Sequence, residues 1–292
     1  MKYMIGVDMG TTSTKAVLYD ENGKFIMKHN IGYDLHTPNV DVSEENPDEI
    51  FDAVLMTVKY IVRESGIAKE DIKFISLSAQ MHSLIAMNAD NQRLTENITW
   101  ADNRANDYAD LIEKSYGGFE LYQRTGTPIH PMSPLSKIFW MRHEEPEIFK
   151  QTAMFADLKT YVLFQLYERF VIDYSLGSAT GMMNLEQLDW DNKALELLGI
   201  ERNQLPQLVP TTHVLTGMKK RYATLMGIDE QTPVIVGASD GVLSNLGVNS
   251  YQKGEVAVTI GTSGAIRTVI NQPKTDEPGR IFRYILDKDQ SV

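Results

Sequence analysis

Residues 5–18 read IGVDMGTTSTKAVL, and this stretch decides how the rest of the chain is interpreted. The apolar residues around Asp8 predict a buried strand over residues 4–8, and a second strand is expected over residues 15–19. The turn between them consists of glycine and hydroxyl residues, namely Gly10, Thr11, Thr12 and Ser13. The chain therefore opens with two strands joined by a turn rich in hydrogen-bond donors.

The same order of elements returns about 250 residues later. Strands are predicted over residues 256–260 and 265–270, on either side of the turn Gly261-Thr262-Ser263-Gly264. A third strand is expected after each hairpin, over residues 25–29 in the first copy and 281–286 in the second. Two copies of this pattern indicate a duplicated core.

Helix and strand signals alternate between the two copies. Helices are expected over residues 47–65, 102–116 and 241–247, and strands over residues 72–79 and 233–237. Residues 119–184 have a mostly helical pattern that several prolines interrupt. This alternation predicts an α/β fold with a helical insertion, and substrate pockets are often built in such insertions.

The composition excludes several classes of protein. The 292 residues include 28 basic and 39 acidic side chains, a net charge of −11, and no cysteine. An acidic surface argues against nucleic acid or an anionic membrane as a partner, and the lack of cysteine excludes disulfides and thiolate chemistry. Neither a signal peptide nor a membrane span is expected, which favours a cytoplasmic protein. Any anionic ligand must be held by local positive groups against the net charge.

The two glycine-hydroxyl turns are suited to phosphate binding. Backbone N–H groups of such a turn point into one concavity, and the hydroxyls add further donors. Asp8 precedes the first turn, where a carboxylate can hold Mg²⁺. The alternative is a pair of ordinary hairpins, but two turns with the same flanks favour phosphate binding. The expected phosphate-binding residues are Gly10, Thr11, Thr12, Ser13, Lys15, Gly261, Thr262 and Ser263.

Several longer motifs resemble one known family. IGVDMGTTSTKAVL and VTIGTSGAIRTV resemble the two phosphate motifs of the actin, Hsp70 and sugar-kinase superfamily. MSPLSKIFWMRHE at 132–144 resembles the signature of the FGGY carbohydrate kinases, as do QMH at 80–82 and WADNR at 100–104. VIDYSLGSATGMMNL at 171–185 and GASDGVLSNLGV at 237–248 are similar to the gluconate-kinase branch of that family.

The resemblance implies a fold and a division into lobes. The fold is the ribonuclease H-like α/β fold of the actin, Hsp70 and sugar-kinase ATPases, in which two lobes clasp ATP. Residues 1–247 correspond to the complete N-terminal lobe, and residues 248–292 to the first strands of the C-terminal lobe. The remainder of that second lobe is not represented, so weak or absent catalysis is expected of this chain by itself.

The resemblance also implies roles for individual residues. Asp240 resembles the family's catalytic aspartate and is expected to be the general base, with a simple helix N-cap as the alternative. Asp8 and Asp240 are the expected carboxylates of a Mg²⁺ site and of the catalytic centre. Substrate contacts are implied for Gln80, Met81, His82, Trp100, Asp102, Arg104 and Asp240.

Some of these residues have a structural alternative. Arg104 is the cation expected at a gluconate carboxylate, because a guanidinium binds a carboxylate through two hydrogen bonds; the alternative is an ion pair on a helix. His82 can equally be a structural histidine, and Trp100 can belong to the core. Lys137 lies in the kinase signature, with either a site role or a purely structural one. Gly241 stands where many relatives have asparagine, which agrees with the gluconate branch.

The implied function is ATP-dependent phosphorylation of D-gluconate to 6-phosphogluconate, which would feed the pentose phosphate pathway. ATP and Mg²⁺ are the implied cofactors. The alternatives are a kinase for another polyol or ketose such as xylulose, and a non-catalytic actin-like nucleotide-binding module. The expected partner is a small-molecule substrate, and association into a homodimer is left open.

Overall fold

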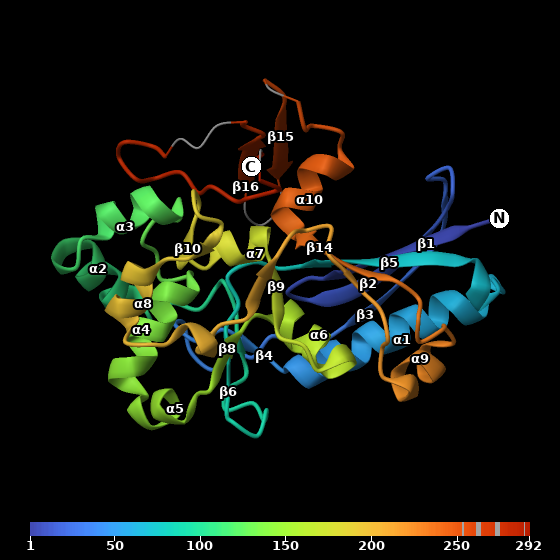
Figure 1. The fold of residues 1–292 in the computed structure, drawn as a ribbon, viewed down its shortest axis with the longest axis horizontal. Coiled ribbons are helices and arrows are strands. Elements are labelled where there is room, and N and C mark those ends of the chain that lie inside the picture. Colours follow the sequence, from blue (N-terminus) through green and yellow to red (C-terminus); the bar gives the residue numbers. More distant parts are fainter. Residues whose placement is uncertain (253, 261–263, 272–274, 289) are drawn as a thin grey trace.

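A six-stranded sheet forms the centre of the molecule, with the strand order β13-β14-β5-β1-β2-β3 (Figure 1). The computed structural model describes residues 1–252, 254–260, 264–271, 275–288 and 290–292. The sheet contains β1 (Tyr3–Met9), β2 (Ser13–Asp20), β3 (Phe25–Gly32), β5 (Ile72–Ala79), β13 (Val214–Leu215) and β14 (Val234–Ser239). Strands β1, β5 and β14 are parallel, whereas β1, β2 and β3 form the predicted antiparallel meander.

Helix α1 (Pro47–Ser65) packs against β1, β2 and β3, as the apolar face of its sequence predicts. The Asn46 side chain caps the helix by accepting a hydrogen bond from the Asp48 N–H. Gly66 ends it with φ +67°, a conformation that glycine adopts without a steric penalty. Ile5, Leu18 and Ile50 are completely buried in the core between sheet and helix.

The helical insertion lies at the end of the sheet opposite the N-terminus (Figure 1). The remaining helices are α2 (Asn106–Ser115), α3 (Gly118–Thr125), α4 (Pro134–Glu144), α5 (Pro146–Gln151), α6 (Leu158–Tyr167), α7 (Tyr174–Ala179), α8 (Asn192–Leu198), α9 (Lys220–Met226) and α10 (Asp240–Gly247), with short 3₁₀ turns at Lys69–Asp71 and Arg202–Gln204. Short strands outside the central sheet form two-stranded pairs: β4 (Glu44–Glu45) with β7 (Asn97–Ile98), β6 (Ile85–Met87) with β8 (Met154–Ala156), β9 (Val171–Asp173) with β12 (Gln207–Val209), and β10 (Met183–Asn184) with β11 (Asp189–Trp190).

The predicted helix over residues 102–116 begins later than expected. Helix α2 starts at Asn106, because the preceding residues make non-helical contacts. The Asp102 carboxylate accepts hydrogen bonds from the backbone of Ser43 and Arg104, and the Asn103 N–H donates to the Asp41 carbonyl. Long-range hydrogen bonds thus replace the first helical turn that the sequence alone predicts.

The second hairpin, β15 (Val256–Ile260) with β16 (Gly264–Thr268), forms a separate two-stranded sheet. It lies above α10, away from the central sheet (Figure 1). Val258 and Ile260 are 60% and 86% exposed. The second copy of the sequence pattern therefore forms its hairpin without joining a larger sheet among the described residues.

The third strand predicted for the second copy, over residues 281–286, is wrong. Tyr284 exchanges two backbone hydrogen bonds with Val292, and the Leu286 N–H donates to the Gln290 carbonyl, but two further backbone N–H groups of this stretch donate to earlier parts of the chain. The Arg283 N–H donates to the Gly126 carbonyl, and the Ile285 N–H donates to the Ser178 hydroxyl. These contacts bury Tyr284 and Ile285 against the helical insertion.

No helix within the described part of the chain is long and apolar enough to cross a membrane.

Candidate functional site

Two carboxylates meet at the edge of the sheet where its parallel strands end. Asp8 lies near the end of β1, opposite Ser78 on β5, and the Ser78 hydroxyl donates a 2.7 Å hydrogen bond to Asp8 Oδ1. Asp240 follows the neighbouring strand β14. Both carboxylates line one recess of about 410 Å³, which β16 of the second hairpin closes from the other side with Arg267.

Asp240 is the first residue of α10, but it is not the N-cap. Ser239 takes that role by accepting a hydrogen bond from the Val242 N–H, so the Asp240 carboxylate stays available to the recess. Desolvation raises the pKa of Asp240 above its ordinary value, and the charge of Asp8 adds to this rise. The Gly241 N–H, which donates to Asp240 Oδ1 at 2.7 Å, and the charge of Arg267 oppose it.

A close approach of two strands fixes the backbone before Asp240. At Gly237, with φ +70°, a side-chain methyl would lie only 1.8 Å from the Leu77 carbonyl oxygen. The register between β14 and β5 shifts at this point, between Ile235 and Ala238. Glycine is required here because any Cβ would collide with the backbone of β5.

A buried ion pair contacts the backbone of the residues that precede Asp240. Lys159 and Asp173 are 2.6 Å apart, and both side chains are almost completely excluded from solvent. The Lys159 ammonium also donates to the Ala238 carbonyl, and the Ser239 N–H donates to the Ser175 hydroxyl. Ser175 in turn donates to the Asp173 carboxylate. The chain that leads into Asp240 is therefore held by charged groups with no exposure to solvent.

The recess has the donors that Mg²⁺ prefers. The described residues contain no group of three or more histidine, aspartate or glutamate side chains arranged as a metal site. Asp8 and Asp240 nevertheless share one recess. Mg²⁺ commonly uses one or two carboxylates together with phosphate oxygens and water, so this pair fits such an ion once a nucleotide supplies its phosphates.

The first glycine-hydroxyl turn is closed by its own backbone. The Gly10 N–H donates to the Ser13 carbonyl at 3.1 Å, so this amide is used within the turn. Thr12 is exposed at its tip. Lys15 lies directly opposite Asp8 in the antiparallel ladder, so the two side chains emerge on the same face. Gly261, Thr262 and Ser263 of the second turn lie outside the described residues.

Thr11 links this turn to two predicted substrate residues. Its hydroxyl donates to Gln80 Oε1 at 3.3 Å and accepts a hydrogen bond from Trp100 Nε1 at 3.0 Å. Gln80 Nε2 then donates to Glu45 Oε2, which also accepts a hydrogen bond from Asn97. Trp100 is 42% exposed, so the structure does not place it in the core.

Glu45 is a residue of this network that the sequence analysis missed. It is 1% exposed, and desolvation raises the pKa of its carboxyl to about 7 even though Asn97 and Gln80 donate to it. Its sequence signal, a second acidic residue just before the helix cap Asn46, resembles an ordinary charged helix start. Its burial depends on tertiary contacts, namely the pairing of β4 with β7 and the hydrogen bonds from Gln80 and Asn97.

Met81 and His82 follow Gln80 in a turn that faces the second hairpin and the C-terminal segment. A methyl on Gly241 would lie 2.8 Å from Met81 Cε, so Met81 sits beside the residue that follows Asp240. His82 is buried with φ +63°, and its Nε2 lies 3.0 Å from the Tyr284 hydroxyl. Burial and the nearby Lys137 lower the pKa of His82 to about 3, so the imidazole is neutral near pH 7.

Lys137 joins the two segments that carry the predicted substrate residues. Its ammonium donates to the carbonyl oxygens of His82, Ile98 and Thr99 at 2.6, 3.3 and 2.6 Å. Burial lowers the pKa of Lys137 to about 7. All three acceptors are backbone carbonyl oxygens. The Lys137 side chain therefore has the structural role that the sequence gave as one of two alternatives.

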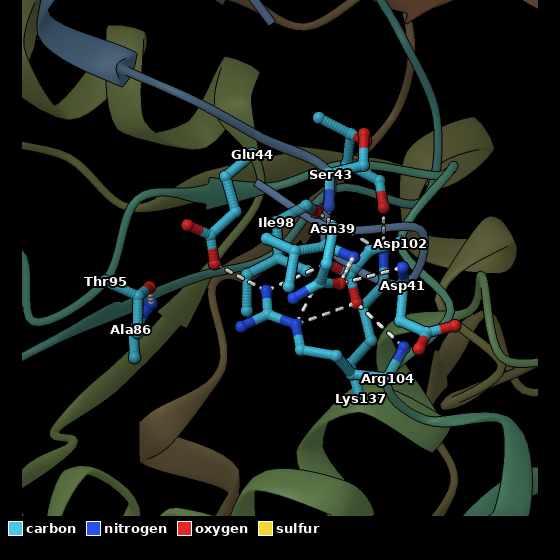
Figure 2. A network of polar contacts seen from close by, with 12 residues as sticks. Asn39, Asp41, Ser43, Glu44, Ala86, Thr95, Ile98, Asp102, Arg104 and Lys137 are labelled. Atoms are coloured by element: carbon cyan, nitrogen blue, oxygen red, sulfur yellow. Dashed lines mark hydrogen bonds and ion pairs between the residues drawn. The ribbon is translucent and has the colours of Figure 1, made fainter. Parts of the chain in front are cut away.

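Arg104 does not face the recess with Asp8 and Asp240. Figure 2 shows it between two carboxylates: its guanidinium bonds both oxygens of the buried Asp102 and lies 2.5 Å from Glu44 Oε1. The guanidinium also stacks on Trp140, with 4.8 Å from Cζ to the ring centroid. The geometry supports the ion-pair alternative for Arg104, because its charge is already neutralised by acidic neighbours.

Comparison with known proteins places this geometry in a family. A family model described as the N-terminal domain of the FGGY family of carbohydrate kinases matches residues 3–247. The chain belongs to this family. A curated relative, gluconokinase of Bacillus subtilis (strain 168), is 54% identical over 284 residues, which cover 97% of this chain and 55% of the relative.

Solved structures agree with this assignment. A gluconate kinase from Lactobacillus acidophilus aligns with a TM-score of 0.96 and 40% identity over 99% of this chain and 58% of its own. A ligand-bound xylulose kinase from the same species aligns equally well, over 100% and 59%. The predicted α/β fold of the sugar kinases is thereby confirmed, and the chain spans a little more than half the length of these relatives.

Proposed function

We propose that this chain contributes the sugar-binding side and the catalytic carboxylates of an ATP-dependent D-gluconate kinase that forms 6-phosphogluconate. The observation that carries the proposal is the meeting of Asp8 and Asp240 in one recess, at the ends of parallel strands. The identity to a gluconokinase supports the substrate, and the match to the FGGY family supports the reaction class.

Asp240 is proposed as the general base. Phosphoryl transfer requires a carboxylate that orients the attacking hydroxyl and accepts its proton. Because Ser239 caps the helix, the Asp240 carboxylate is not consumed by capping. Its raised pKa makes it a stronger proton acceptor than an ordinary aspartate, and its ionised form is lost as the pH falls through that raised value.

Asp8 is proposed to hold the cation that accompanies ATP, together with Asp240. When bound, Mg²⁺ supplies positive charge that offsets the charge developing on the transferred phosphoryl group. The chain's own contribution is the first turn, where Thr12 and Ser13 offer hydroxyl groups and Lys15 adds a positive charge on the Asp8 face. Ser78 keeps the Asp8 carboxylate oriented by donating to Oδ1.

The substrate is proposed to lie between the Gln80-Met81-His82 turn and Asp240. Met81 packs beside Gly241, which brings this turn next to the proposed base. Trp100 is partly exposed and is tied to the phosphate turn through Thr11. We further propose that residues 1–247 form one lobe and that residues 248–292 begin a second.

The proposal is tested by titrating the 292-residue chain with D-gluconate in a calorimeter and by measuring gluconate-dependent release of ADP from ATP. We expect gluconate to bind and ADP release to be weak. Absence of gluconate binding at millimolar concentration contradicts the proposed substrate. Rapid ADP release from these residues alone contradicts the expectation of weak turnover and leaves the substrate assignment intact.

Xylulose is the second candidate substrate, because a solved xylulose kinase is as similar to this chain as a solved gluconate kinase. The two sugars differ in charge, since gluconate carries a carboxylate and xylulose is neutral. A parallel titration with D-xylulose therefore decides between them. Tighter binding of xylulose than of gluconate would reverse the assignment.

A further inference from the structure

Arg267 reaches the proposed catalytic recess from the second hairpin. A methyl on Gly241 would lie 3.2 Å from both Nε and Nη2 of Arg267. Arg267 is on β16, whereas Gly241 is the second residue of α10, directly after Asp240. The guanidinium and Met81 Cε, which would lie 2.8 Å from the same methyl, therefore share the space that a side chain at position 241 would fill, next to the proposed base.

The charge of Arg267 acts on the Asp240 carboxylate in the same recess, but no ion pair with a described residue holds the guanidinium. It forms no side-chain hydrogen bond or ion pair with any residue that the structure describes. Three other cations are paired with carboxylates: Arg104 with Asp102 and Glu44, Lys159 with Asp173, and Arg280 with Asp276. Among the described residues Lys15 and Arg283 likewise form no ion pair, but Arg283 donates to the Ser291 hydroxyl. A partly buried guanidinium without a partner is a binding group for an anion.

Arg267 also separates two recesses of different charge. The first, of about 410 Å³, contains the carboxylates Asp8 and Asp240. The second, of about 590 Å³, is lined by Arg280 with its partner Asp276, by Arg283 and by the aromatic residues Phe282 and Tyr284. Arg267 lines both. A ligand that crosses from the first recess to the second therefore meets two carboxylates at one end and, since Asp276 is paired with Arg280, the guanidinium of Arg283 at the other.

A sugar acid matches this change of charge. Its transferred hydroxyl belongs near Asp240, whereas its carboxylate is repelled by Asp8 and Asp240 in a chain of net charge −11. A carboxylate can be accommodated only where a cation compensates this repulsion. Arg267 supplies that cation at the border of the acidic recess, on the side that leads to Arg283.

We propose that Arg267 binds the carboxylate of the sugar-acid substrate and that Gly241, by lacking a side chain, makes room for its guanidinium. Arg267 thereby sets the preference for a sugar acid over a neutral polyol. This inference rests on the proposed function, because it assumes that the hydroxyl to be phosphorylated lies at Asp240. The sequence predicted that Arg104 binds the carboxylate of gluconate. The proposal gives this role to Arg267 on β16 instead.

The test compares D-gluconate with D-glucitol, which has the same carbon chain with a hydroxymethyl group in place of the carboxylate. Binding of both to the 292-residue chain is measured by calorimetry for the unaltered protein, Arg267→Met and Arg267→Lys. We expect Arg267→Met to bind gluconate roughly 10- to 100-fold more weakly, the range of one lost charge-assisted contact, with glucitol binding unchanged. Arg267→Lys should recover part of the preference.

Arg63→Met is the matched control, because Arg63 is an exposed residue of α1 whose side chain contacts Glu64 and the Tyr60 ring, both outside the proposed site. It should bind both ligands as the unaltered chain does. Gly241→Ala supplies a second variant, since its methyl presses on the guanidinium; because the methyl also presses on Met81 Cε, its effect is interpreted only in combination with Arg267→Met. It should reduce gluconate binding in the unaltered background and cause no further reduction of the gluconate preference in Arg267→Met.

Each outcome decides the proposal. If Arg267→Met keeps the preference for gluconate over glucitol, Arg267 does not bind the carboxylate. If the variant loses affinity for both ligands equally, Arg267 acts on a group common to both, which also overturns the proposal. If the unaltered chain binds neither ligand, the proposed function fails and this inference fails with it. Thermal unfolding of each variant shows whether a loss reflects binding or folding.

Discussion

The two glycine-hydroxyl hairpins share a sequence pattern but differ in their surroundings. The first, β1–β2, lies inside a six-stranded sheet with α1 packed against it. The second, β15–β16, pairs only with itself among the described strands, and Val258 is 60% exposed where the corresponding Val7 is 1% exposed. A local sequence pattern thus specifies a hairpin. The strands and helices that pack against the hairpin decide how much its side chains contribute to the free energy of unfolding.

The hairpins also differ in register, with a chemical consequence. Asp8 pairs with Lys15 across the first hairpin, whose turn holds one residue more than that of the second. At the equivalent rung of the second hairpin Thr259 pairs with Ala265, and Arg267 lies two residues further along. The first hairpin therefore offers an acid for a cation, and the second offers a cation for an anion.

The largest expected effect on stability concerns the buried ion pair between Lys159 and Asp173, which contacts the segment before Asp240. Lys159→Met removes the ammonium from Asp173 and leaves that carboxylate without its counter-charge. We expect a loss of about 3–5 kcal/mol in the free energy of unfolding, measured by urea denaturation. Lys193→Met is the control: the exposed Lys193 pairs with Glu196 in solvent, so this change should cost less than about 1 kcal/mol. Equal effects would mean that burial does not distinguish the two pairs.

The second prediction concerns the pH dependence of the free energy of unfolding that results from the buried carboxyl of Glu45. The folded pKa of Glu45 is about 7, above its unfolded value of 4.5, so the folded state holds a proton that the unfolded state releases. Its contribution to stability is therefore fully present below pH 4.5 and falls as the pH rises towards 7. This decline is on the order of 3 kcal/mol and should disappear in Glu45→Gln. A stability difference between Glu45→Gln and the unaltered chain that does not change between pH 4.5 and 7 would contradict the buried position.

The third prediction compares equivalent valines in the two hairpins. Val7→Ala should lower the free energy of unfolding by roughly 2 kcal/mol, because it leaves a cavity in the core. Val258→Ala should change it by less than about 0.5 kcal/mol, because Val258 faces solvent. Chemical denaturation of both variants gives the values. A large loss in Val258→Ala would show that the second hairpin is covered in solution.

The smallest effect is expected from the hydroxyls of the hairpins. Thr11→Val removes the hydrogen bonds to Gln80 and Trp100 and should cost about 1 kcal/mol. Thr268→Val removes a bond to the Glu255 carbonyl at an exposed position, where water replaces it at little cost. Trp100 fluorescence should change in Thr11→Val alone. If it changes in neither variant, Thr11 does not hold the indole in solution.

The sequence predicts the elements of the first lobe well and the second copy less well. The apolar alternation around Ile5 and Val7 identifies β1, and the cap at Asn46 with the glycine at Gly66 gives both ends of α1. These signals are local, because neighbouring residues along the chain produce them. The predicted strand over residues 281–286 fails because Gly126 and Ser178, distant in sequence, supply its hydrogen-bond partners.

The candidate site divides in the same way. The sequence predicts the position of Asp240 after a buried strand and that of Asp8 before the first turn. The burial of Glu45 and the pairing of Arg104 with Glu44 are not predicted, since both depend on contacts between residues 35 to 60 positions apart in the sequence. A charged side chain has the same sequence signal whether it is free or paired.

The sequence by itself determined the α/β order, the two Gly-Thr hairpins and the identity of the acids, Asp8 near the end of β1 and Asp240 directly after β14. Periodicity and turn chemistry act over a few residues, so the sequence contains them directly. Only the tertiary structure decided that Arg104 is neutralised, that Lys137 stands behind the site, and that Arg267 lies over Gly241. Charge and burial depend on distance in space, and folding alone sets which distant residues meet.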